Sequence, residues 1–232
     1  MIISYKYKFI FLRPRKVGGT SVHLALSFQS GEYDTISKLY NMKNEPRNEG
    51  CEKYYRRLCS RSNLVEGAHN DVETIRRRFG VYYFDKYKKI SIVRNPWECH
   101  FSRFLYVKSF DDIKCYRKII GGDFDFCKKE FKKYTDERII AKDMHSIDKY
   151  CFLEDKFILD FTLMFHNLEN DYRKMCRYIG IKYIKLPRAK CYIRPINMHY
   201  HRYYDDELIS VVLNHNRKTI DHFNYKFGDG SI

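Results

Sequence analysis

Residues 8–28 read KFIFLRPRKVGGTSVHLALSF, and this stretch decides the fold class. Residues 8–12 are apolar and rich in Phe and Ile, which is typical of a buried strand. A proline and two glycines within residues 13–19 then interrupt the apolar pattern and predict a turn. Residues 20–28 supply apolar side chains for a buried helix. We therefore expect a strand, a glycine-containing turn and a helix in direct succession.

The predicted turn has the chemistry of an anion-binding site. Glycines let a backbone approach a ligand closely, and a helix start offers N–H groups without intrahelical partners and the positive end of a dipole. Thr20 and Ser21 add hydroxyl groups, and Lys16 adds a cation. Because Lys16 precedes the glycines, the segment is not a Walker A loop, and it also lacks the G-x-G-x-x-G pattern. An ordinary ATPase or kinase and a dinucleotide-binding fold are therefore disfavoured.

Strand and helix patterns alternate along the rest of the chain. Further strands are predicted at 89–93 and 157–161. The predicted helices are 70–79 with Asn70 as its cap, 97–108, one or two within 111–133 broken at Gly121-Gly122, 167–179, and 205–223. Alternating strands and helices predict an α/β domain with a mostly parallel central sheet. The 232 residues fit a single domain, which we assign to residues 1–232.

The first motif resembles a known nucleotide-binding loop. Residues 16–21, KVGGTS, are similar to the K-[TV]-[AG]-G-T-S phosphosulfate-binding loop of the sulfotransferase superfamily, and residues 11–27 resemble its bacterial and viral members of carbohydrate type. Arg15 stands where many of those proteins have Pro. The resemblance implies a P-loop-like, three-layer α/β/α fold and the donor 3′-phosphoadenosine 5′-phosphosulfate (PAPS). It implies donor contacts from a continuous set of residues, Arg15, Lys16, Val17, Gly18, Gly19, Thr20 and Ser21.

A second motif follows the strand predicted at 89–93. Arg94-Asn95-Pro96 ends that strand, and Ser102 lies two turns into the next helix. In the sulfotransferase superfamily an Arg and a Ser at matching positions bind the 3′-phosphate, so the resemblance implies this role for Arg94 and Ser102. A guanidinium suits the task because it donates two parallel hydrogen bonds to phosphate oxygens. Cys99 stands where relatives often have Arg, so one basic contact of the family is absent.

The resemblance also implies a mechanism. Lys16 is expected to stabilise charge on the leaving phosphate oxygen, while a general base takes the proton of the acceptor hydroxyl. His69 is the first candidate base, because it precedes a helix at a place where related sequences often have His. Glu66 is the rival, since other branches use a carboxylate. His23 and His100 fall on predicted helices and are expected to be structural.

Composition points to an anionic partner. The chain has 44 Lys and Arg against 29 Asp and Glu, a formal net charge of +15. This charge suits a nucleotide or an acidic glycan, and we expect a carbohydrate hydroxyl as the acceptor, with a small metabolite, a lipid head group or a protein tyrosine as the alternatives. A nucleic-acid-binding protein, a P-loop nucleotide kinase and a pseudoenzyme that only binds the nucleotide remain alternatives. The basic residues are dispersed and no nucleic-acid-binding motif is present, so nucleic acid is not the expected partner.

Cysteine spacing and hydropathy indicate the cellular compartment to be expected for the protein. None of the eight cysteines forms a C-x-x-C pair, and we predict no metal. No segment approaches the ~20 apolar residues of a membrane span, and the first residues have no secretory pattern. We therefore expect a cytoplasmic protein without a membrane span and with free thiols.

Overall fold

The computed structural model divides the chain into two compact units. Unit 1 comprises Met1–Val93 and Lys149–Lys190, and unit 2 comprises Arg94–Asp148 and Cys191–Ile232. Each unit has its own cluster of buried apolar side chains. The assignment of residues 1–232 to one domain stays a prediction. The structure describes residues 1–38, 56, 58, 64–65, 67, 69–189, 193, 195 and 198–229.

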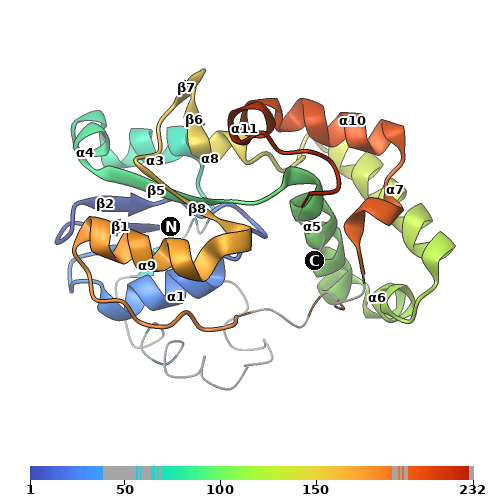
Figure 1. Ribbon diagram of the computed structural model, residues 1–232, viewed down its shortest axis with the longest axis horizontal. Coiled ribbons are helices and arrows are strands. Elements are labelled where there is room, and N and C mark those ends of the chain that lie inside the picture. Colours follow the sequence, from blue (N-terminus) through green and yellow to red (C-terminus); the bar gives the residue numbers. More distant parts are fainter. Residues whose placement is uncertain are drawn as a thin grey trace. The chain divides into compact units, whose positions relative to one another are not determined.

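Unit 1 is built around a six-stranded sheet (Figure 1). In sheet order the strands are β4 (Leu64–Val65), β3 (Thr35–Ser37), β1 (Ile2–Ser4), β2 (Phe9–Phe11), β5 (Lys88–Val93) and β8 (Phe161–Met164). β2, β5 and β8 pair in parallel, as do β3 and β4, whereas β1 is antiparallel to both of its neighbours. All strands but β1 therefore run in one direction. The predicted α/β class with a mostly parallel central sheet is confirmed.

Helices cover both faces of this sheet. Successive strand residues point to opposite faces, so Ile3 and Ile10, which pair across β1 and β2, share one face. Their face packs in one apolar cluster with Val72 and Ile75 of α3 (Val72–Phe79) and Phe84 of α4 (Val81–Lys86). The opposite face lies toward α1 (Gly19–Gln29) and α9 (Leu168–Ile179), as Figure 1 shows.

Strand β1 was not predicted from the sequence. It has three residues. The turn that follows it contains Lys8 at φ 52°, a left-handed conformation that the presence of a lysine in the sequence does not predict. Asp34 stabilises this turn, because its carboxylate accepts hydrogen bonds from the Ser4 hydroxyl (2.8 Å) and the Tyr5 backbone N–H (2.9 Å). The stabilising contact therefore comes from a residue distant in sequence.

Two further boundaries differ from the prediction. Asp71, not Asn70, caps α3, because its carboxylate accepts a hydrogen bond from the Thr74 backbone N–H at 2.8 Å. The strand predicted at 157–161 is also displaced. Its first residue, Phe157, belongs to a hairpin of β6 (Phe152–Leu153) and β7 (Lys156–Phe157), which follows the short helix α8 (Asp148–Cys151). The sheet strand begins only at Phe161.

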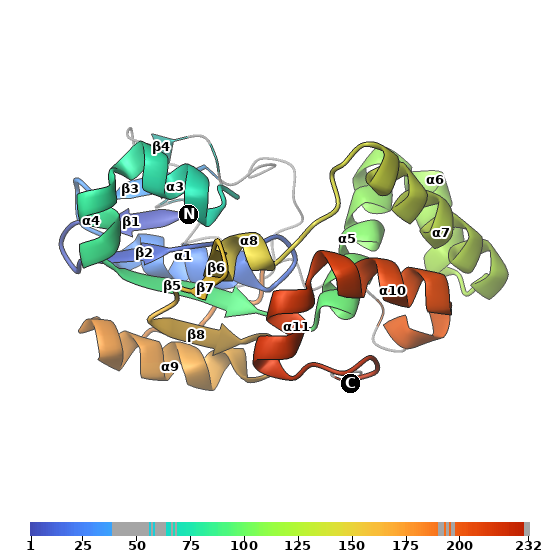
Figure 2. The same cartoon turned by 90° about the horizontal axis from the view of Figure 1, so that it is seen from above.

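Unit 2 is helical in its described residues (Figure 2). Its helices are α5 (Pro96–Asp111), α6 (Ile113–Ile120), α7 (Phe124–Ile140), α10 (Asp206–His215) and α11 (Arg217–Phe223), with a 3₁₀ turn at Tyr200–Tyr203. Aromatic side chains dominate the core: Phe101 packs on Phe131 with ring centroids 5.1 Å apart, and Trp97 Nε1–H donates to the Ile209 carbonyl at 3.0 Å. The predicted break at Gly121-Gly122 is confirmed.

The single helix predicted at 205–223 is wrong. Asn216 interrupts it, and the Asn216 amide is fully engaged at the break. Its Oδ1 accepts from the Ile147 backbone N–H at 2.8 Å, and its Nδ2 donates to the Val212 carbonyl at 3.1 Å. A buried amide that satisfies the backbone of another segment outweighs the continuous helical pattern.

Among the described residues, no helix is long and apolar enough to cross a membrane. The described cysteines, Cys99, Cys115, Cys127, Cys151 and Cys176, are buried and carry free thiols.

Candidate functional site

The first motif forms the connection between β2 and α1 in unit 1. After β2, the Leu12 backbone N–H still pairs with the Ile90 carbonyl of β5 at 2.8 Å. The chain then turns through Lys16 at φ 62° and Gly18 at φ 79°, and α1 begins at Gly19. The left-handed conformation of Lys16 is a strained one for a residue with a Cβ, and such strain is common at ligand-binding turns. The predicted strand, turn and helix are confirmed.

The packing of neighbouring side chains explains why positions 18 and 19 of the turn are glycines. A Cβ on Gly19 would lie 2.6 Å from Cγ of Arg13, so the Arg13 side chain occupies the space that any other residue would need. At Gly18 the left-handed φ already disfavours other residues, and a Cβ there would lie 3.0 Å from Leu168 and 3.2 Å from Phe165. Arg13 on one side and Leu168 and Phe165 on the other therefore leave no room for a larger residue at positions 19 and 18 of the turn.

The N-terminus of α1 lacks a side-chain cap. Gly18 occupies the cap position, and the first turn contains no acidic residue. Side-chain caps that accept backbone hydrogen bonds begin α3, α5, α6, α7 and α10, whereas α4, α9 and α11 lack one, as α1 does. In the first turn, the Ser21 backbone N–H donates to the Gly18 carbonyl at 3.2 Å. The N–H groups of Gly19 and Thr20, together with the helix dipole, can therefore serve an external anion or solvent.

The side chains around this N-terminus are basic and polar. Arg15 is exposed and Lys16 is half-buried, whereas Val17 is fully buried and can meet a ligand only through its backbone. Thr20 Oγ1 accepts a hydrogen bond from Arg13 Nη1 at 3.5 Å, and Ser21 Oγ accepts one from the Ala189 backbone N–H at 3.2 Å. Each hydroxyl can still donate its own hydrogen.

Arg13 joins the turn to His69, and the sequence alone did not single it out. It is 4% exposed, and its backbone carbonyl lies 2.8 Å from Nδ1 of His69. The Tyr150 hydroxyl donates to the His69 carbonyl at 2.8 Å and fixes that residue from the other side. The signal available in the sequence was an arginine that directly follows an apolar strand and precedes two glycines by a few residues, whereas its burial is seen only in the structure.

Burial and positive charge keep His69 neutral. Burial is the largest cause of its strongly lowered pKa, followed by the charge of Arg13, with Arg15 adding a smaller effect in the same direction. A carbonyl oxygen can only accept, so Nδ1 of the neutral ring carries the proton and Nε2 holds the lone pair. His69 therefore has the tautomer of a base, but an intrinsically weak one. Glu66, the rival base, lies outside the described residues.

The two histidines expected to be structural are deeply buried. His23, on α1, is fully buried, and neither ring nitrogen has a hydrogen-bond partner within the part of the chain that the structure describes. Its pKa is lowered mainly by burial. In unit 2, His100 Nε2 lies 3.0 Å from Thr135 Oγ1, and burial lowers the His100 pKa to about 3.

The second motif lies in unit 2 and has a different character. Asn95 caps α5, accepting from the backbone N–H groups of Trp97 (3.1 Å) and Glu98 (3.4 Å). Arg94 is 6% exposed and donates to both carboxylate oxygens of Glu98, at 3.0 and 2.7 Å. Ser102 is also buried on this helix. Arg94, Glu98 and Ser102 are spaced four residues apart, so a carboxylate stands between the two predicted phosphate contacts.

Cys99 stands beside this pair and is 1% exposed, so the position where relatives often have Arg carries a buried thiol here. Among the described residues, no group of three or more His, Cys, Asp or Glu side chains could hold a metal ion.

Fold and site together define an α/β protein with an uncapped, basic helix N-terminus at the carboxyl edge of a mostly parallel sheet. No protein-family profile matches the chain, and no solved structure matches it significantly. An uncharacterized protein of Archaeoglobus fulgidus is 32% identical over 109 residues, which are 46% of this chain and 79% of that protein. The chain belongs to the same family as that archaeal protein.

Proposed function

We propose that the protein is a PAPS-dependent sulfotransferase with a P-loop-like fold. The observation that carries the proposal is the uncapped N-terminus of α1, which directly follows a buried strand in the sequence KVGGTS. Backbone N–H groups without caps, two hydroxyls and two flanking cations suit a 5′-phosphosulfate. Of these two cations, Lys16 is half-buried and Arg15 is exposed.

Sulfuryl transfer makes demands that these residues can meet. The acceptor oxygen forms a bond to sulfur while the bond from sulfur to the bridging phosphate oxygen breaks, and negative charge grows on that leaving oxygen. We assign its stabilisation to the Lys16 ammonium and the first-turn N–H groups of α1. The proton of the acceptor hydroxyl passes to Nε2 of His69, the unprotonated nitrogen of the neutral ring.

The lowered pKa of His69 limits this role in the ligand-free protein. Its causes include the positive charges of Arg13 and Arg15, which disfavour a second proton on the ring. An anion bound at the N-terminus of α1 offsets those charges, so the pKa of His69 rises when the donor binds. The base thus gains strength only in the loaded enzyme.

The second motif is the weaker part of the proposal. Arg94 and Ser102 are the expected contacts of the 3′-phosphate, but Glu98 engages the Arg94 fork on both oxygens. A phosphate dianion next to that carboxylate is repelled. Binding of the 3′-phosphate therefore requires Arg94 to turn from Glu98 to the phosphate, or Glu98 to accept a proton.

The acceptor remains the expected carbohydrate hydroxyl, in keeping with a net charge of +15 that favours acidic glycans. The test measures binding by calorimetry, with adenosine 3′,5′-bisphosphate, ATP with Mg²⁺ and a single-stranded oligonucleotide as ligands. The proposal predicts preferential binding of the bisphosphate, followed by transfer of radiolabelled sulfate from PAPS to a glycan in a panel of acceptors. Preference for ATP with Mg²⁺ supports a nucleotide kinase instead, and preference for the oligonucleotide supports a nucleic-acid-binding protein.

A further inference from the structure

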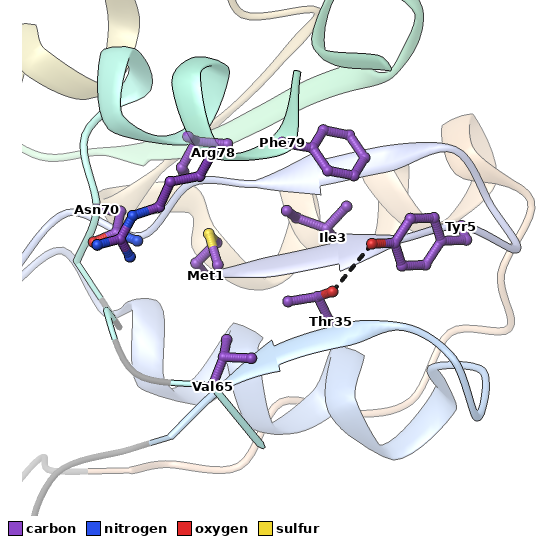
Figure 3. Close-up of a pocket in the computed structure, with 9 residues that line it drawn as sticks. Met1, Ile3, Tyr5, Thr35, Val65, Asn70, Arg78 and Phe79 are labelled. Atoms are coloured by element: carbon purple, nitrogen blue, oxygen red, sulfur yellow. Dashed lines mark hydrogen bonds between the residues drawn. The ribbon is translucent and has the colours of Figure 1, made fainter. Parts of the chain in front are cut away.

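Unit 1 contains a pocket that the proposed reaction does not use. Its volume is about 250 Å³, and it lies over the sheet face that carries Ile3, beside α3 (Figure 3). Apolar side chains line most of it: Met1, Ile3, Val65, Ile75 and Phe79. Ile3 and Ile75 are 5% and 1% exposed and form a buried floor, whereas Tyr5 and Val65 are 41% and 36% exposed and form a rim.

Aromatic rings make one wall of this pocket rigid. The Phe79 ring packs on Tyr5 and Tyr87 with centroid distances of 5.8 and 5.3 Å, and on Tyr83 at 5.5 Å. The Tyr5 hydroxyl is engaged with Thr35 Oγ1 at 3.3 Å, as the dashed line in Figure 3 marks. The aromatic rings on one side of the pocket and the aliphatic side chains at its base favour a flat apolar ligand. Such a ligand loses little conformational entropy on binding and fills the pocket.

The ionisable groups of the pocket lining are all basic. Of the nine described residues that line it, Arg78 has the one charged side chain and none is acidic. Met1 adds its α-amino group, which donates to Ser37 Oγ at 2.8 Å and whose pKa is lowered mainly by burial. Figure 3 shows the Arg78 side chain extending from α3 toward the end of the pocket where Asn70 lies. Asn70 is held there by a turn that begins at Gly67, whose φ of 91° and lack of a Cβ let the Asn70 amide pack against it. A guanidinium and an amide at one end of an apolar pocket are donors for an anion.

We propose that this pocket binds a small organic anion with an apolar ring body. The ring lies against Ile3, Ile75 and Phe79, and the anionic group meets Arg78 and Asn70. The volume agrees with this class, because a dry cavity of about 150 Å³ already binds benzene. Asn70 directly follows His69, so the occupant is a neighbour of the candidate base; that relation rests on the proposed function, whereas binding itself does not.

The test compares two probes of one shape, naphthalene-1-carboxylate and the neutral naphthalene-1-carboxamide. Binding is followed by methyl NMR of the full chain, with Met1, Ile3 and Ile75 as reporters. We expect saturable shifts at these methyls with the carboxylate and about tenfold weaker binding of the amide, since one charge-assisted contact is lost. Arg78→Gln is expected to abolish the preference for the carboxylate.

Matched variants separate this site from charge attraction in general. Arg77→Gln removes an equally exposed arginine from the same last turn of α3 that does not line the pocket, and it is expected to keep the preference. Val65→Trp fills the pocket from its exposed rim and is expected to weaken both probes. Lys16→Ala is expected to leave probe binding unchanged, so failure of the sulfotransferase proposal does not affect this result. Equal effects of Arg77→Gln and Arg78→Gln, or no shift at the three reporter methyls, would overturn the proposal.

Discussion

The two motifs look alike in the sequence and differ in the structure. Each follows a buried strand and leads into a helix, but the residue at the cap position of α1 is Gly18, which has no capping side chain, whereas Asn95 caps α5. The cations differ in setting as well: Lys16 has a left-handed backbone in the turn that leads into α1, and Arg94 forms an ion pair with Glu98. A strand, a turn and a helix therefore suit an anion better where no side chain caps the helix start.

The largest effect is expected at Lys16. Lys16→Ala removes the half-buried cation of the turn that leads into α1, so sulfuryl transfer from PAPS should fall about 10²–10³-fold, the usual cost of losing a transition-state donor. Single-turnover kinetics with radiolabelled donor measure it. Lys182→Ala, at an exposed position of unit 1, serves as the control and should keep full activity. Equal rates of the two variants would remove Lys16 from the mechanism.

A smaller but still large effect is expected from Gly19→Ala. The new Cβ must displace the buried Arg13 side chain at 2.6 Å, which should cost about 1–3 kcal/mol of unfolding free energy. The loop geometry, and with it nucleotide binding, should suffer in the same variant. Gly31→Ala is the matched control, because its Cβ meets neighbours only at 3.5 Å or more. Denaturant unfolding of both variants checks the difference.

The buried histidines predict how stability depends on pH. His69 in unit 1 and His100 in unit 2 have folded-state pKa values below the ordinary value, so the unfolded chain takes up protons first as the pH falls. Stability is therefore complete above about pH 6.5 and decreases below it by about 1.4 kcal/mol per pH unit for each such histidine.

Ligand binding should change the pKa of one of these two histidines and leave that of the other unchanged. Adenosine 3′,5′-bisphosphate is expected to raise the pKa of His69, because it offsets the charges of Arg13 and Arg15, and to leave His100 unchanged. Denaturation curves at a series of pH values, repeated with His69→Asn and His100→Asn, give each contribution. A ligand effect on the His100 contribution alone would place the anion away from α1.

The smallest effect concerns Glu98. If Arg94 has to leave Glu98 to hold the 3′-phosphate, Glu98→Gln should tighten binding of adenosine 3′,5′-bisphosphate by about fivefold, the equivalent of about 1 kcal/mol of removed repulsion. Binding of AMP, which lacks the 3′-phosphate, should not change. Weaker binding of the bisphosphate in this variant would instead mean that Glu98 positions Arg94 for the ligand.

Much of the fold was predictable because its determinants are local. The turn at residues 13–19, the break at Gly121-Gly122 and most helices follow from glycine, proline and apolar periodicity. β1, the break at Asn216 and the late start of β8 were not predictable, because each depends on a partner distant in sequence, such as Asp34 for the turn after β1.

The candidate site shows the same division. Lys16 and the two glycines are visible in the sequence, whereas the role of Arg13 depends on its burial and on the contact with His69. The Arg94–Glu98 pair also follows a simple spacing of four residues, but the sequence does not show that both side chains are buried together. The spacing of residues in the sequence indicates which side chains can come into contact, and burial determines which of these pairs form an ion pair in the folded protein.

The central claim is that the first-turn N–H groups of α1 hold the anionic end of the donor. Backbone amide NMR during titration with adenosine 3′,5′-bisphosphate tests it most directly. The account predicts that the amide signals of Gly18, Gly19 and Thr20 shift most, and that the amides of the capped first turn of α3, Glu73 and Thr74, stay unchanged. Saturable binding that leaves the α1 amides unmoved would contradict the account.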